Sequence, residues 1–129
     1  MKRIIIILML SCFLITGCSL KKLAVVEKIE VAKVKQIIDN SERYPNTIII
    51  DVRTEEEYLL KHLKGAINIP LDEIKNIDIA KDKQIILYCQ SGNRSSQAGE
   101  ILVELGYKHI FDMGGTNSWI YEFSEGEEK

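Results

Sequence analysis

The feature that most constrains the fold is an apolar strand that runs directly into a polar loop and then into an amphipathic helix. Residues 84–88 end in a run of isoleucine, leucine and tyrosine, which is typical of a strand buried on both faces. Residues 89–95 follow as a short polar loop, and apolar side chains then recur at helical spacing between positions 98 and 105. This unit predicts an α/β domain with a mainly parallel central sheet flanked by helices.

The rest of the chain repeats this alternation. Residues 47–52 form a β-branched run typical of a second buried strand, and Thr54 and Glu57 then fit a capping box that begins a short helix. In parallel sheets ligands bind at the carboxyl ends of strands, which is where Cys89 falls. The other expected elements are a helix over 31–38, an extended segment over 65–70, a helical turn over 71–74, a helix from Asn93 to a Gly106 cap, a strand over 108–113, a glycine turn at 114–115 and a last short helix over 118–123.

The N-terminus has the composition of an export signal. Lys2 and Arg3 precede an apolar stretch over residues 4–15, which is too short to span a bilayer comfortably as a mature helix. Residues 15–18, Ile-Thr-Gly-Cys, resemble the lipobox of bacterial lipoproteins, and this resemblance implies that Cys18 becomes the first mature residue and carries the lipid. The alternatives are a plain signal anchor and an uncleaved hydrophobic helix.

These patterns divide the chain into four parts. Residues 1–17 are expected to be the lipoprotein signal peptide, 18–28 a lipidated tether, 29–123 the globular domain and 124–129 an acidic, frayed tail. The protein is therefore expected on the extracytoplasmic face of the bacterial cell envelope, where the lipid anchor would be its only attachment to the membrane.

Composition narrows the class of partner and the redox chemistry. The 129 residues carry a formal net charge of -2, which offers no argument for binding nucleic acid. Of the three cysteines, Cys12 lies in the leader and Cys18 would be consumed by lipid, so Cys89 would be the sole free thiol of an exported domain. Neither His62 nor His109 has metal-ligand spacing with Cys89, and no metal or other cofactor is expected.

The loop that begins at Cys89 has the surroundings that convert a thiol into a reactive thiolate. Its backbone N–H groups and the N-terminus of the following helix attract anions, Gly92 permits a tight curl, and Arg94 adds a full positive charge. The alternative for Cys89 is an inert buried cysteine. For Arg94, contact with an anion above the sulfur and a loop brace without substrate contact both stay open.

Four further polar residues belong to this candidate site. The hydroxyls of Ser91 and Ser95 can donate to the sulfur or to a bound anion. Gln90 and Asn93 are expected to project outward and to touch the substrate at the mouth of the site.

Three ordered stretches of the sequence resemble the rhodanese family of sulfurtransferases. They are Asp51-Val52-Arg53 with Glu57-Tyr58, the run His-Leu-Lys-Gly-Ala-Ile-Asn-Ile-Pro over 62–70, and the loop 89–95, with Gly114-Gly115 and Trp119 at the expected places downstream. The resemblance covers nearly all of residues 29–123 and implies a single rhodanese-like domain.

The resemblance implies a sulfurtransferase. Cys89 would take sulfane sulfur from a small anionic donor such as thiosulfate, and the persulfide would pass its outer sulfur to cyanide or to a thiol, which can belong to another protein. The amides of residues 90–95 would hold the thiolate and persulfide, and Arg94 would attract the donor.

Two other functions stay open beside sulfur transfer. One is a persulfide carrier or redox-sensing binding module without turnover. The other is a phosphatase or arsenate reductase, which is less favoured because only four residues separate Cys89 from Arg94. The related dual-specificity phosphatases have a loop one residue longer, which makes room for a phosphate.

The remaining polar and aromatic residues of interest favour structural roles. Asp51 and Arg53 are candidates for ordering the active loop from a neighbouring strand end, although an ion pair or turn brace is favoured. His62 is interpreted as a capping or packing residue, and Trp119 as a core or cleft-wall aromatic. The three glutamates over 55–57 are expected to be a solvated helix start.

Overall fold

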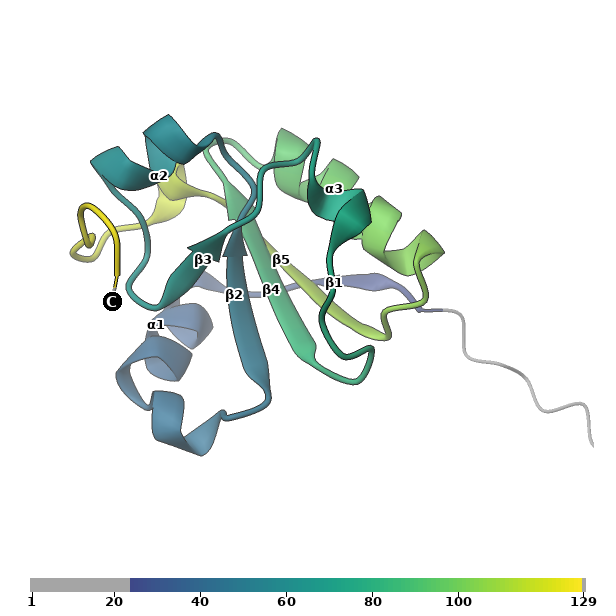
Figure 1. The fold of residues 1–129 in the computed structure, drawn as a ribbon. Helices are drawn as coiled ribbons and strands as arrows, with labels where there is room; N and C mark the ends of the chain where they lie inside the picture. The colour runs from purple at the N-terminus through teal and green to yellow at the C-terminus, as the bar shows by residue number, and fades with distance from the viewer. Residues whose placement is uncertain (1–23, 129) are drawn as a thin grey trace, which may run out of the picture.

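The computed structural model of the protein describes residues 24–128 and shows a five-stranded sheet covered by helices (Figure 1). The strands lie in the order β1-β5-β4-β2-β3, and every pair of neighbours is parallel. The predicted α/β class with a parallel central sheet is confirmed. The elements are β1 (Val26–Lys28), α1 (Val31–Asp39), η1 (Ser41–Arg43), β2 (Thr47–Asp51), α2 (Glu55–Leu60), β3 (Ala66–Asn68), η2 (Ile74–Asn76), β4 (Gln84–Cys89), α3 (Asn93–Glu104), β5 (His109–Gly115) and η3 (Thr116–Ser118).

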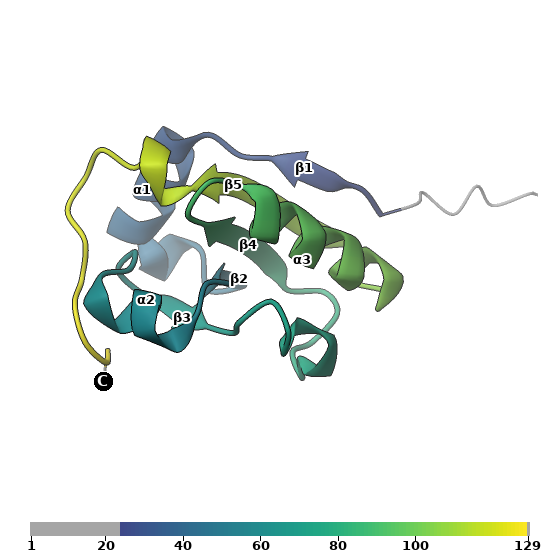
Figure 2. The ribbon, with the colours of Figure 1, turned by 90° about the horizontal axis from the view of Figure 1, so that it is seen from above.

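The sheet separates two apolar cores. On the central strand β4, Ile86 and Tyr88 belong to the core that includes α1 and α2. The alternate residues Ile85, Leu87 and Cys89 belong to the core that includes α3. Figure 2 shows α3 on one side of the sheet and α1 and α2 on the other. Because β4 is buried on both faces, its sequence is a continuous apolar run.

Two helices begin directly after the two central strands. The predicted capping box of α2 is present: the Thr54 hydroxyl accepts from the Glu57 N–H at 3.3 Å, and the Glu57 carboxylate accepts from the Thr54 N–H at 2.9 Å. Helix α3 begins after Gly92, which has a φ of 99°. Since β2 and β4 are parallel, the N-termini of α2 and α3 lie at the same edge of the sheet as Cys89.

The N-terminal boundary of the domain differs from the prediction. Residues 26–28, which the prediction assigned to the tether 18–28, form β1 and pair with β5. The Lys28 ammonium also donates to the buried Asp112 carboxylate at 2.6 Å. A strand of three residues is too short to show a periodicity, which is why the prediction missed it.

The end of β5 also differs from the prediction. The strand continues through Gly114 and Gly115, where a turn was expected, and its register against β4 shifts by one residue after Asp112. The expected helix over 118–123 is absent. The backbone of Trp119 is extended, with a φ of -81° and a ψ of 116°. The short turn η3 therefore ends at Ser118.

The acidic C-terminal segment is attached to the domain, whereas the prediction made it frayed. Ser124 and His62 exchange two backbone hydrogen bonds of 2.8 and 2.9 Å, and the Gly126 N–H donates to the Leu59 carbonyl at 2.9 Å. Figures 1 and 2 both show this segment beside α2. Residues 124–128 therefore belong to the folded unit.

The predicted signal peptide, Cys18 and the first part of the tether lie outside the described residues. Within residues 24–128, no helix is both long and apolar enough to cross a membrane. In the same part of the chain, no group of three or more histidine, cysteine or acidic residues is arranged to hold a metal ion.

Candidate active site

Cys89 is the last residue of the central strand β4, and the loop after it turns back over the sulfur. The residue is 1% exposed, so its thiol is almost fully enclosed. The Gly92 N–H donates to Sγ at 3.0 Å. This contact depends on the positive φ of Gly92, a conformation that costs other residues energy.

Opposing effects act on the ionisation of the Cys89 thiol, and the net result favours the thiolate. Burial, the largest single effect, raises the pKa of Cys89 because it penalises the charged form. Hydrogen bonds from the backbone and hydroxyl of Ser95 and from the N–H groups of Gly92 and Ser91 together outweigh it, so the pKa is lowered. The Ser95 hydroxyl oxygen lies 3.6 Å from Sγ. The loop therefore stabilises the form of sulfur that acts as a nucleophile.

Gly115 fixes the loop against the neighbouring strand, a role that the sequence analysis did not assign to it. It pairs with Cys89 across the sheet. A Cβ atom at this position would lie 1.9 Å from the Gln90 carbonyl oxygen, which is far inside contact distance. The Asn117 N–H donates to the same carbonyl at 3.2 Å. The close approach of β5 to the loop thus requires glycine at position 115.

Arg94 makes an ion pair that the sequence analysis did not predict. Its Nη1 and Nη2 atoms donate to the two carboxylate oxygens of Glu57 at 2.7 and 2.9 Å. Hydrogen bonding from Arg94, the largest effect, lowers the pKa of Glu57 to about 2. Glu57 is therefore a partner of the active loop, and the prediction of a purely solvated helix start was wrong for this residue. No local sequence signal joins two residues that lie 37 positions apart.

Comparison with known proteins decides the family. Residues 30–122 match the family of rhodanese-like domains. The chain belongs to the rhodanese family. It is 49% identical over 70 residues to the thiosulfate sulfurtransferase PspE of Escherichia coli K12, a match that covers 51% of this chain and 67% of PspE.

Solved structures show the same relationship. A rhodanese with anions from E. coli is 39% identical and has a TM-score of 0.57, with 62% of this chain and 99% of that chain covered. A rhodanese-like domain protein from Staphylococcus aureus is 27% identical and has a TM-score of 0.68, with 79% of this chain and all of that chain covered. The chain thus contains a rhodanese-like domain over residues 30–122.

Asp51 and Arg53 form a buried ion pair at the end of β2, the arrangement that the sequence analysis favoured. Arg53 Nε and Nη2 donate to the Asp51 carboxylate, with a shortest distance of 2.6 Å, and Nη2 also donates to the Lys61 carbonyl at 2.6 Å. Burial lowers the pKa of Arg53, because it penalises the charged form. The carboxylate of Asp51 raises this pKa, and the net effect is an increase. The pair ties β2 to the end of α2, and none of its hydrogen bonds reaches the loop 89–95.

Gln90 and Asn93 are exposed at the mouth of the rhodanese loop, where they were expected. Ser91, whose hydroxyl was expected to donate to the sulfur or to an anion, is also exposed, and it reaches the sulfur through its backbone N–H. Beside them lies an open cleft of about 440 Å³, which runs from the loop toward the segment after β3. The cleft is lined by Val52, Thr54, Pro70, Leu71, Asp72 and Arg94.

His62 packs inside the rhodanese domain, which agrees with the interpretation of its role. Its ring stacks on Tyr58 with 3.9 Å between centroids, and Nδ1 lies 2.9 Å from the Tyr58 carbonyl oxygen. Nε2 has no hydrogen-bond partner among residues 24–128, although the Glu128 carboxylate is 3.5 Å away. These contacts attach α2 to the C-terminal segment.

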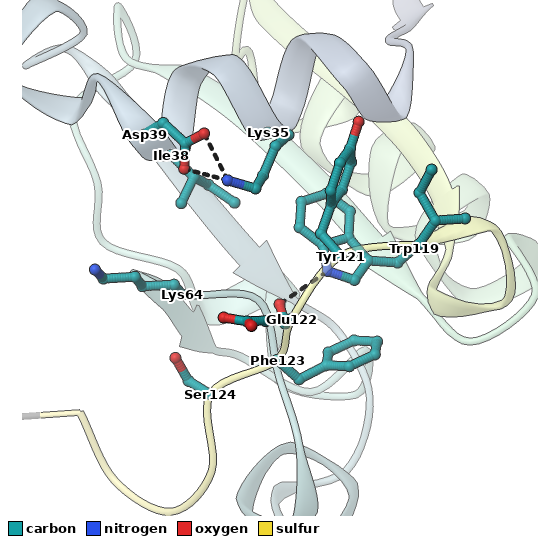
Figure 3. A pocket seen from close by; sticks show the side chains of 10 residues that line it. Lys35, Ile38, Asp39, Lys64, Trp119, Tyr121, Glu122, Phe123 and Ser124 are labelled. Carbon is teal, nitrogen blue, oxygen red and sulfur yellow. Dashed lines mark hydrogen bonds and ion pairs between the residues drawn. The ribbon is translucent and has the colours of Figure 1, made fainter.

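A second cavity lies away from the sulfur. It has a volume of about 740 Å³ and lies between α1 and residues 119–124. Figure 3 shows Lys35 and Asp39 of α1 on one side and Tyr121, Glu122 and Phe123 on the other. Trp119 is 7% exposed and donates its indole N–H to a backbone carbonyl at 3.2 Å, so it is both a core and a cleft-wall aromatic. The loop 89–95 contributes no residue to this cavity.

Proposed function

We propose that this rhodanese domain moves sulfane sulfur from a thiosulfate-like donor to a thiophilic acceptor through a persulfide on Cys89. The observation that carries the proposal is the enclosed Cys89 sulfur, which accepts a hydrogen bond of 3.0 Å from Gly92 and has a lowered pKa. The similarity to a protein named thiosulfate sulfurtransferase supports this choice of donor.

In the first step, the Cys89 thiolate attacks the outer sulfur of thiosulfate. A new S–S bond forms to Cys89, the S–S bond of thiosulfate breaks, and sulfite leaves with the electron pair. The charge is conserved, because a thiolate and a thiosulfate dianion become a persulfide anion and a sulfite dianion. The N–H groups that lower the pKa of the thiol also stabilise the persulfide anion.

In the second step, cyanide or a thiolate attacks the outer sulfur of the persulfide. The bond between the two sulfurs breaks, and Cys89 regains its electron pair as a thiolate. Cys89 is the only cysteine among the residues that the structure describes. The acceptor therefore comes from outside this part of the chain, as a small molecule or as the thiol of another protein.

Formation of thiocyanate from thiosulfate and cyanide tests this function directly. The wild-type chain is expected to turn over, whereas Cys89→Ser is expected to lose all activity above background, because serine oxygen cannot form the persulfide. Ser96→Ala is the control, since Ser96 is exposed in the nearby helix α3 and its side chain forms no hydrogen bond with any residue that the structure describes. Equal turnover by the wild type and Cys89→Ser would reject the proposal.

We also propose that the domain is an exported lipoprotein held to the bacterial cell envelope through Cys18. The proposal rests on the basic start, the apolar run and the lipobox-like residues 15–18. Cys18→Ser is expected to move the protein from the membrane fraction to the soluble fraction, and Cys12→Ser is expected to leave it membrane-bound. Unchanged fractionation of Cys18→Ser would contradict the lipid anchor.

A further inference from the structure

The ion pair between Arg94 and Glu57 limits what the charge of Arg94 can do at the mouth of the site. Arginine has five N–H donors in a planar fork, and Glu57 accepts from both terminal nitrogens at 2.7 and 2.9 Å. The Thr54 N–H and hydroxyl also donate to Glu57, at 2.9 and 3.0 Å, and they share Oε2 with Arg94 Nη1. The carboxylate is therefore built into the start of α2 and is aimed at the active loop.

Three more acidic residues lie along this edge of the domain. The other arginine that follows a central strand, Arg53, is buried and paired with Asp51. Asp72 lines the cleft beside Arg94, and Glu55 and Glu56 are exposed in the first turn of α2. An anion that approaches the loop thus meets a cation that already has a carboxylate partner.

We propose that Glu57 is a specificity-determining residue that partly neutralises Arg94 and so disfavours dianionic sulfur donors relative to donors with one negative charge. The favoured class comprises thiosulfonates and the persulfide anions of thiols. The inference rests on the proposed sulfur transfer and specifies the charge of its preferred donor.

Two matched pairs of reagents separate charge from shape. Iodoacetate and iodoacetamide alkylate the same sulfur at similar size but differ by one negative charge. Thiosulfate and methanethiosulfonate differ by one charge in the same way, and each gives Cys89 persulfide with release of sulfite or methanesulfinate. The rates of alkylation by iodoacetate and iodoacetamide measure the charge selectivity at Cys89 without any sulfur transfer.

The variant Glu57→Gln removes the charge and keeps the cap. A glutamine carbonyl oxygen can still accept from the Thr54 N–H, as in other capping boxes, so the start of α2 is preserved. Glu56→Gln is the control, because it removes the same charge from the adjacent position in the same helix turn, where the side chain is exposed. Both variants are made in the full chain, and alkylation is read by mass spectrometry on the peptide that contains Cys89.

In Glu57→Gln, we expect the iodoacetate-to-iodoacetamide rate ratio and the thiosulfate-to-methanethiosulfonate ratio of kcat/KM to rise about three- to tenfold. In Glu56→Gln both ratios should stay within about twofold of the wild type, because exposed charges are screened by salt. The difference between the two variants should shrink as ionic strength rises.

An alkylation ratio in Glu57→Gln equal to that of the wild type would overturn the inference, as would an equal rise in both variants. If the alkylation ratio rises but no variant transfers sulfur from either donor, charge selection by Glu57 stands and the proposed function falls. Thus the two failures are distinguishable.

Discussion

Ser95 is the residue on which the chemistry of the Cys89 sulfur most depends. Its backbone N–H and its hydroxyl both contribute to the lowered pKa of Cys89. The hydroxyl oxygen is also 3.1 Å from the Gly92 carbonyl oxygen and 3.4 Å from the Gly114 carbonyl oxygen. A hydroxyl has one proton, so it can donate to a carbonyl beside the neutral thiol and to Sγ beside the thiolate. Rotation of one hydroxyl thus adapts the loop to either charge state.

Replacement of Ser95 by alanine is expected to raise the pKa of Cys89, because the hydroxyl hydrogen bond that favours the thiolate is lost. Because the folded pKa is lowered, the thiolate stabilises the fold above the ordinary thiol pKa, and this contribution is lost as the pH falls through the folded pKa. The measurement is the pH dependence of iodoacetamide alkylation at Cys89. Ser96→Ala serves as the control, and an unchanged inflection in Ser95→Ala would contradict the role of this hydroxyl.

At the scale of elements, short segments are positioned by a few close contacts. Helix α2 has only six residues, yet its Glu57 contacts the active loop and its Tyr58 stacks on His62. The backbone of His62 in turn pairs with Ser124 of the C-terminal segment. Strand β1 has three residues, and it packs against α3 where Gly99 leaves space for Val26. A Cβ atom at position 99 would lie 2.8 Å from Val26 Cγ2.

Gly99→Ala tests whether β1 is part of the domain. Without β1, alanine should stabilise the helix by about 1 kcal/mol through its higher helix propensity. With β1 packed as described, the clash with Val26 should cost about 1–3 kcal/mol and make the variant less stable. The double variant Val26→Ala/Gly99→Ala should recover much of the loss, as measured by urea unfolding. A net stabilisation by Gly99→Ala alone would show that Val26 does not pack there.

At the scale of the whole molecule, local patterns predicted local structure and missed contacts between distant segments. The alternation of strands and helices, the capping box at Thr54 and the position of Cys89 at the end of a central strand follow from patterns within about ten residues, and the structure has all three. The pairing of Arg94 with Glu57 depends on the parallel order of β2 and β4, so neither segment shows it alone. The attachment of residues 124–128 to His62 and the need for glycine at position 115 also depend on contacts between distant segments, so the sequence did not predict them.

The central claim is that Cys89 carries sulfane sulfur, and the mass of the intact protein after incubation with thiosulfate tests it most directly. The intact wild-type protein is expected to gain the mass of one sulfur atom, carried on Cys89. It is expected to lose this mass on addition of cyanide or a thiol. Cys89→Ser is expected to gain nothing. An unchanged wild-type mass at saturating thiosulfate, or the same gain in Cys89→Ser, would contradict the account.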